Sequence, residues 1–250
     1  MKVFMFLLIL LVSGRVVAQT ASDTVDYEKD FRENVARHGR IAIGLKAGYS
    51  LTNLYGKEIA YLFASPRTQW LGGFHAGVLV NAKLRESFWL KHELLFLQKG
   101  ASVTLTDDIN GSYASTLKAY YLEWHPLSPT FHYKGWQGYF GPYIGTVTAA
   151  HITRKDDSGK SYQDKSIFGD ESNFEKEKKY LQKFDFGFAA GIEYQFSFGL
   201  LLGAKYTHGL TDIFQYANSY TLEDTKHDKI NIHHRSILFS VGYLFDKRKF

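Results

Sequence analysis

The chain has 250 residues, with 30 lysines and arginines against 25 aspartates and glutamates, and it contains no cysteine. The net charge of +5 falls to a near-neutral +3 without the first 18 residues, which argues against a nucleic-acid partner. The missing cysteines exclude disulfide bonds and attachment of a lipid to a cysteine. With 17 Tyr, 20 Phe and 22 Gly but only 4 Pro, the composition favours strands rich in aromatic residues and glycine.

The first 18 residues have the pattern of a secretory signal peptide. Lys2 gives a positive start, Val3–Val12 is an apolar run, and Val16 and Ala18 form a small-residue cleavage pattern. A membrane anchor is the alternative, but this run is about half of the roughly 20 residues that a spanning helix needs. Cleavage after Ala18 removes two of the 30 basic residues, which leaves 28 against 25 acidic ones and a net charge of +3.

A short segment separates the signal peptide from the first strand. Within it, Asp23–Arg37 carries apolar residues every four positions (Tyr27, Phe31 and Val35), which fits one face of a helix. A disordered linker is the alternative, and the pattern leaves both open. The expected domain organisation is a signal peptide over 1–18, a periplasmic N-terminal segment over 19–40, and an outer-membrane β-barrel domain over 41–250.

Eight segments after residue 40 alternate between two kinds of side chain with the period of two that indicates a strand. Their lengths suit tilted strands that cross a bilayer, which need roughly 9–11 residues. The segments are Ile41–Tyr49, Trp70–Lys83, Phe88–Gln98, Tyr113–Trp124, Trp136–Ala150, Leu181–Phe196, Phe198–Thr207 and Arg235–Phe245.

The connections between these segments alternate between long and short. Long polar loops follow the odd-numbered strands, at Ser50–Gln69, Lys99–Ser112, His151–Tyr180 and His208–His234. Shorter links follow the second, fourth and sixth strands, at Leu84–Ser87, His125–Gly135 and a turn near Ser197. Outer-membrane barrels have this arrangement, with long extracellular loops and short periplasmic turns. The predicted fold is all-β: an eight-stranded antiparallel up-and-down transmembrane β-barrel, with the short N-terminal periplasmic helix as an option.

The two faces of the predicted strands differ in character. One face is almost continuously apolar, as in the row Phe184, Phe186, Phe188, and His92 is its one polar interruption. The other face carries glycines and charges. An eight-stranded barrel has an interior just wide enough for side chains to fill, and buried charges are tolerated only when paired. We therefore expect a barrel-interior charge network made of seven residues: Lys46, Lys91, Glu93, Glu123, Asp185, Glu193 and Lys205.

A soluble lipocalin-like barrel, with the aromatic face inside, explains the alternation equally well. It does not explain the glycines in the centres of the would-be solvent face, the sorted loops, or the aromatic residues near the strand ends, such as Trp70, Trp124 and Tyr243. The membrane assignment predicts that Ala190→Arg, on the lipid face, blocks assembly, and that Gly187→Ser, on the inner face, is milder.

Several stretches resemble the PorT-like outer-membrane β-barrel family of Gram-negative bacteria. They include "IAIGLKAGYSLTNLYG", "GFHAGVLVNAKLRESFWLKHELLFLQKGA", "LKAYYLEWHPL", "GYFGPYIG", "FGFAAGIEYQF" and "HRSILFSVGYLF". The resemblance covers 41–245 and implies a small glycine-rich barrel behind a signal peptide. The fourth strand departs from the family's "YLEIP" pattern because one residue is inserted before Pro126. The founding member of the family is linked to type IX protein secretion.

Three functional hypotheses follow. The first is a non-enzymatic integral scaffold or interaction protein whose partners are outer-membrane lipid and envelope or secretion proteins. The second is a membrane-embedded enzyme acting on lipid or lipopolysaccharide, for which His92 is the candidate; the sequence shows no serine and carboxylate paired with it. The third is metal binding by the last long loop, through Asp224, His227, Asp228, His233 and His234, although their spacing matches no standard zinc pattern.

The first hypothesis is preferred. It predicts no enzymatic activity, no cofactor, no metal and no nucleic-acid partner, and it leaves the oligomeric state and a role in secretion open.

Overall fold

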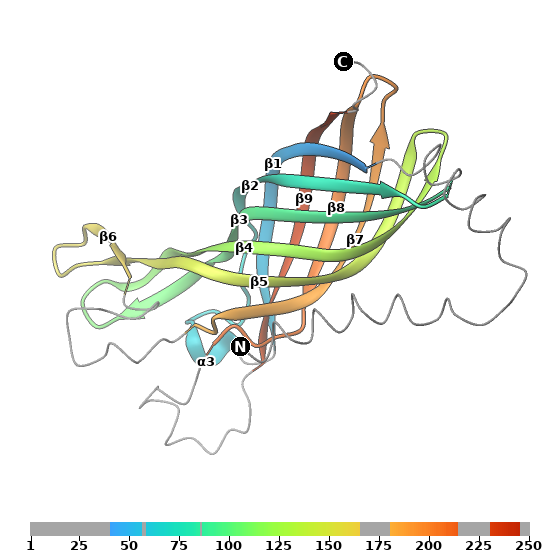
Figure 1. Ribbon diagram of the computed structural model, residues 1–250. Helices are drawn as coiled ribbons and strands as arrows, with labels where there is room; N and C mark the ends of the chain where they lie inside the picture. Colours follow the sequence, from blue (N-terminus) through green and yellow to red (C-terminus); the bar gives the residue numbers. More distant parts are fainter. Residues whose placement is uncertain (1–40, 57–58, 86, 166–180, 215–230, 246–250) are drawn as a thin grey trace, which may run out of the picture. The chain divides into compact units, whose positions relative to one another are not determined.

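The computed structural model describes residues 41–56, 59–85, 87–165, 181–214 and 231–245 (Figure 1). The signal peptide and the candidate helix at 23–37 lie outside these residues. No helix within the described ranges is long and apolar enough to cross a membrane.

Nine strands and one short helix make up the described chain. The helix is α3, Ile59–Leu62. The strands are β1 Ile41–Gly56, β2 Leu71–Lys83, β3 Phe88–Asp107, β4 Gly111–Tyr133, β5 Trp136–Lys155, β6 Ser161–Asp164, β7 Phe184–Gln195, β8 Leu200–Gly209 and β9 Ile232–Phe245.

The strands close into a ring. Each pairs antiparallel with its neighbour in the order β1, β2, β3, β4, β5, β7, β8, β9, and β9 returns to β1. The ninth strand, β6, pairs only with the end of β5 and lies outside the ring. The eight ring strands confirm the predicted fold, and β6 is an addition that the sequence did not reveal.

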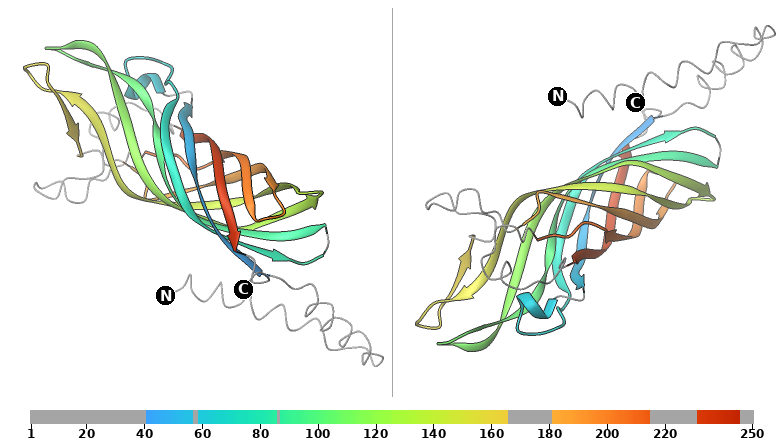
Figure 2. Two further views of the ribbon diagram at one scale, coloured as in Figure 1. Left: turned by 90° about the horizontal axis from the view of Figure 1, so that it is seen from above. Right: turned by 90° about the horizontal axis from the view of Figure 1, so that it is seen from below.

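The predicted strands are the ones observed, but several extend further at one end. β3 and β4 run on through the predicted loop Lys99–Ser112 and form a hairpin around Asp108–Asn110. This hairpin and the β5–β6 hairpin project beyond the ring at the end where α3 lies (Figures 1 and 2). Both long hairpins therefore belong to the end that the loop pattern assigns to the extracellular side.

The predicted link His125–Gly135 is wrong as a loop, because β4 continues to Tyr133. The turn is short: Lys134 and Gly135 both have positive φ, at 48° and 88°, as a two-residue hairpin with primed geometry requires. Strand signals were weak here because the ladder is irregular. The pairing with β5 skips from Trp124 to Thr130, and two prolines in this stretch have no N–H to donate.

The two faces separate as the alternation predicts. Outward apolar side chains are largely exposed, for example Phe186 at 45 % and Phe239 at 50 %, whereas the intervening side chains are buried. Such a protein has its apolar surface outside and its charges inside, the reverse of a soluble barrel.

The inside of the ring has two different layers. The middle is polar and charged. Toward the end with the long hairpins, the inward side chains of β3, β4 and β5 become apolar and pack around Ile59 and Phe63, which come from α3 and the residue that follows it. We call this the apolar plug: Leu54, Ile59, Phe63, Leu95, Leu97, Ala101, Val103, Leu117, Ala119, Tyr121, Val147, Ala150, Ile152, Leu181, Ile213, Phe214, Ile232 and Leu238.

Candidate functional site: the charged barrel interior

The seven predicted interior charges all lie inside the ring, and each side chain belongs to a residue that is 3 % exposed or less. They come from five different strands, because each strand contributes only its inward positions to the lumen. The structure joins them, together with Lys99 and His125, into two groups of ion pairs that meet where Lys205 contacts His125. We call these nine residues the lumen network.

One half of the lumen network centres on Glu193 of β7. Its carboxylate accepts from Lys46 and from Lys91, whose Nζ lies 2.5 Å from Oε2. The Tyr139 hydroxyl donates to Oε1 at 2.9 Å. Lys46 also pairs with Glu93, which links this half to the next. Charge-assisted hydrogen bonds of this kind compensate for the loss of water around each ion.

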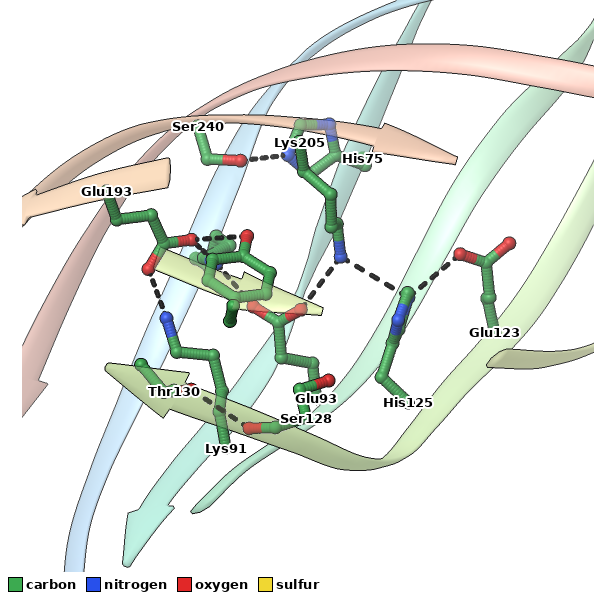
Figure 3. Close-up of polar contacts among 12 residues, drawn as sticks. His75, Lys91, Glu93, Glu123, His125, Ser128, Thr130, Glu193, Lys205 and Ser240 are labelled. Atoms are coloured by element: carbon green, nitrogen blue, oxygen red, sulfur yellow. Dashed lines mark hydrogen bonds and ion pairs between the residues drawn. The ribbon is translucent and has the colours of Figure 1, made fainter. Parts of the chain in front are cut away.

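Glu93 extends the lumen network across the lumen to Lys205 and His125. Lys205 Nζ lies 2.8 Å from Glu93 Oε2 and 3.3 Å from His125 Nε2, and the same imidazole nitrogen lies 2.9 Å from Glu123 Oε1 (Figure 3). An ionised carboxylate can only accept, so the geometry assigns the Nε2 proton to the bond with Glu123. Lys205 then donates to Glu93 and only touches the ring.

The far half of the network is held by Lys99. Its Nζ lies 2.6 Å from Glu123 Oε2 and 2.8 Å from Asp185 Oδ2. Tyr143 donates to the same Asp185 oxygen at 3.3 Å. The predicted network offered Asp185 only Lys46, Lys91 and Lys205 as partners, but the structure pairs it with Lys99.

Lys99 and His125 are the two network members that the sequence interpretation missed. Lys99 was assigned to a loop, although it continues the odd-numbered inward row of β3 that contains Lys91, Glu93 and Leu97. His125 likewise continues the inward row of β4, two residues after Glu123. The alternation itself, followed past the assumed strand ends, was the signal that could have found both.

Adding Lys99 brings the charges of the network into balance. Four lysines (Lys46, Lys91, Lys99 and Lys205) now face four carboxylates (Glu93, Glu123, Asp185 and Glu193). Tyrosine rings complete the shell: Lys91 Nζ lies 4.2 Å from the Tyr139 ring centroid, and Lys99 Nζ lies 4.5 Å from that of Tyr143. Cation–π contact offsets part of the cost of burying an ammonium group.

Inward glycines make room for these tyrosines. A Cβ built on Gly187 would lie 2.6 Å from the Tyr143 ring, and one on Gly191 would lie 2.4 Å from the Tyr139 ring. Gly187→Ser therefore adds atoms that clash with the Tyr143 ring and with the His208 carbonyl oxygen, whereas its being milder than Ala190→Arg stays a prediction.

The alternative sites receive little support from the geometry. His92 lies outside on β3 opposite Val80 and, among the described residues, makes no hydrogen bond or ion pair. The described part of the chain contains no group of three or more His, Cys, Asp or Glu residues that could hold a metal. Of the proposed metal loop, Asp224, His227 and Asp228 lie outside the described residues. His233 and His234 belong to β9 and face opposite ways: His234 is buried beside Tyr121, and His233 lies on the outer side.

Comparison with known proteins places the sequence in a protein family. The model of the outer membrane protein beta-barrel domain family matches residues 17–215. No curated protein sequence matches the chain.

Solved structures similar to this chain include several small barrels. Neisserial surface protein A has 11 % sequence identity over 81 % of this chain and 97 % of its own, with a TM-score of 0.44. Ail of Yersinia pestis, in complex with the heparin analogue sucrose octasulfate, has 12 % identity over 82 % and 99 % of the two chains, with a TM-score of 0.41. The N-terminal β-barrel domain of Pseudomonas aeruginosa OprF has 12 % identity over 83 % and 99 %, with a TM-score of 0.32.

Proposed function

Because this chain belongs to the family of outer membrane protein beta-barrel domains, we propose that it is a closed, non-enzymatic barrel that presents its extracellular hairpins to partners. The protein is located in the outer membrane. The observation that carries the proposal is the lumen network, which fills the middle of the ring with paired, fully buried charges. Open aqueous channels in this class need about 16 strands, twice the number in this ring.

The apolar plug supports the same conclusion from the other end of the lumen. Phe63 N–H donates to the Ile59 carbonyl at 3.0 Å, which fixes the short helical turn that inserts both side chains into the ring. A solute entering from the extracellular side meets this apolar layer before it reaches any charge.

Conductance through planar bilayers tests the closed barrel directly. The mature chain should give no unit conductance steps, and a variant lacking the apolar plug side chains, Ile59→Ala with Phe63→Ala, should also give none because the lumen network remains. Steady channel openings in the unmodified protein would contradict the proposal. Conductance steps that appear only in the double variant would show that the apolar plug, and not the lumen network, closes the barrel.

An enzymatic role is the less favoured candidate. The only acid–histidine pair in the network, Glu123 with His125, is completely buried, and a lipid substrate cannot reach it. Lipid A from a deletion strain and its parent, compared by mass spectrometry, should be identical.

Within the family, we assign the chain to the PorT-like branch on the segments quoted above. That assignment makes a role in protein secretion worth testing, but it is not by itself evidence for such a role. Surface protein secretion in the deletion strain separates the two possibilities: normal secretion supports a general scaffold, and a block supports a component of a type IX-like system.

A further inference from the structure

The outer rim of the barrel, where β1, β8 and β9 end, carries a group of basic and aromatic side chains on its outward face. We call it the outer-rim cluster: Tyr55, Trp70, His208, His233 and Arg235. None of them belongs to the lumen network. The register places Tyr55 beside His233, and Arg235 between Asn53 and His208.

The cluster lies at the edge of the lipid-facing band. On β9 five apolar outward positions in a row are followed by a guanidinium: Phe245, Tyr243, Val241, Phe239, Ile237 and then Arg235. On β8 the outward row from Leu202 through Tyr206 ends in His208 in the same way. Trp70 and Tyr206, both 42 % exposed, mark this level as the aromatic belt at the membrane surface.

Hydrogen bonds hold the cluster in one arrangement. The Tyr55 hydroxyl lies 2.7 Å from the Gly209 carbonyl and 2.7 Å from His208 Nε2. Because the carbonyl can only accept, Tyr55 donates to it and accepts from the His208 Nε2–H. His208 stacks on the Tyr55 ring with centroids 4.8 Å apart, and the His233 ring lies 5.3 Å away.

The remaining donors have no described anionic partner. Arg235 lies over the Trp70 ring at 5.1 Å and near the Tyr55 ring at 5.9 Å, it forms no ion pair with a described carboxylate, and its Nε is buried without a hydrogen bond to any described residue. His233 uses Nδ1 to donate to the Thr211 carbonyl at 2.9 Å, so its Nε2 is an acceptor in the neutral ring and a donor to an anion only when the ring is protonated. The Asp212 carboxylate next to it accepts from the backbone N–H groups of Phe214 and Ile232.

We propose that the outer-rim cluster binds the phosphate group of a lipid in the outer leaflet. Arginine matches the geometry of a phosphate through two parallel N–H donors, and the cation–π contact with Trp70 helps to hold the guanidinium at this level. The outward apolar row below Arg235 gives the acyl chains of the same molecule a surface to lie on. A phosphate with attached acyl chains contacts both the outer-rim cluster and the apolar row, whereas a free phosphate contacts only the cluster.

Native mass spectrometry of the full mature chain in detergent tests this proposal. Phosphatidic acid and diacylglycerol with the same acyl chains are the two probes, since they differ only in the phosphate. The protein should retain phosphatidic acid and not diacylglycerol. Arg235→Gln should weaken phosphatidic acid binding by about tenfold. The matched control is Lys118→Gln, which removes an outward cation of β4 that lies outside the cluster, and it should change binding less than about twofold.

Three outcomes would overturn the proposal. Equal retention of the two probes would show that the protein does not recognise the phosphate. Unchanged binding in Arg235→Gln would show that the outer-rim cluster is not the binding site. Displacement of phosphatidic acid by excess inorganic phosphate makes the site one for a free anion. If heat-modifiable mobility shows that Arg235→Gln has not folded, His233→Gln takes its place, with an expected loss of about threefold.

Discussion

The middle and the outer end of the barrel lumen are both filled, but by opposite chemistry. In the middle, four lysines and four carboxylates exclude water by pairing with one another. At the outer end, α3 and the inward side chains of the long strands exclude water as an ordinary hydrophobic core does.

The difference shows where each kind of filling is possible. The membrane-spanning middle is made only from strands, so their inward side chains must fill the lumen. Long charged side chains do this when each charged group pairs with one of opposite sign from another strand. The outer end lies beyond the bilayer, where loops can fold back and bring Ile59 and Phe63 into the ring. The network therefore ties five of the eight ring strands together. The plug gains Ile59 and Phe63 from a segment outside the ring, and we expect this segment to open without unfolding the ring.

The largest expected effect comes from breaking the network. Glu193→Gln removes one charge that serves both Lys46 and Lys91, and it should lower the free energy of unfolding by about 3–5 kcal/mol because a buried charge loses its partner. Urea unfolding in phospholipid vesicles measures it. The double variant Glu193→Gln with Lys91→Met restores the charge balance and should recover part of the loss. A double variant as unstable as the sum of the two single variants would show that the pairs act independently.

A plug variant should act locally. Phe63→Ala removes a buried ring and should cost about 3 kcal/mol, because deletion of a buried phenylalanine leaves a cavity. We expect this loss to lower the free energy of local opening of the segment around α3. The Phe63 N–H should then exchange its hydrogen faster, while the N–H groups of the ring strands exchange as before. Equal acceleration throughout the ring would make plug and network one cooperative unit.

Packing within the network gives a matched pair of glycines. Gly187→Ala places a methyl group 2.1 Å from the His208 carbonyl oxygen and 2.6 Å from the Tyr143 ring, and it should cost about 1–3 kcal/mol. At Gly145 the nearest contacts of an added Cβ are 3.4–3.7 Å, so Gly145→Ala should be nearly neutral. Unfolding of the two variants side by side measures the difference, and similar stabilities would mean that both Tyr143 and the β8 backbone at His208 can move away at little cost.

The smallest expected effect is at an exposed ion pair outside the ring. Arg154 pairs with Asp164 at 2.6 Å between β5 and β6, with the arginine side chain 46 % exposed. Arg154→Gln should lower the free energy of unfolding by less than about 1 kcal/mol, because water and salt screen such pairs. A loss as large as that of Glu193→Gln would remove the distinction between buried and exposed pairs.

The sequence predicted the ring strands and the side of each strand that faces inward, since alternation with period two survives small errors at strand ends. It failed at Lys99, His125 and the β4 segment before Tyr133, because strand ends beyond the bilayer carry loop-like polar residues and prolines. It also missed the apolar plug, whose members come from strands, a short helix and loops far apart in the chain.

The sequence alone determined the class of protein: eight alternating segments, sorted connections and one charged face are local properties that need no coordinates. Only the tertiary structure decided which lysine meets which carboxylate. Partners such as Lys205 and Glu93 are 112 residues apart and meet because ring closure and register place their strands around one lumen. The same closure brought Tyr55, His208 and Arg235 to one rim.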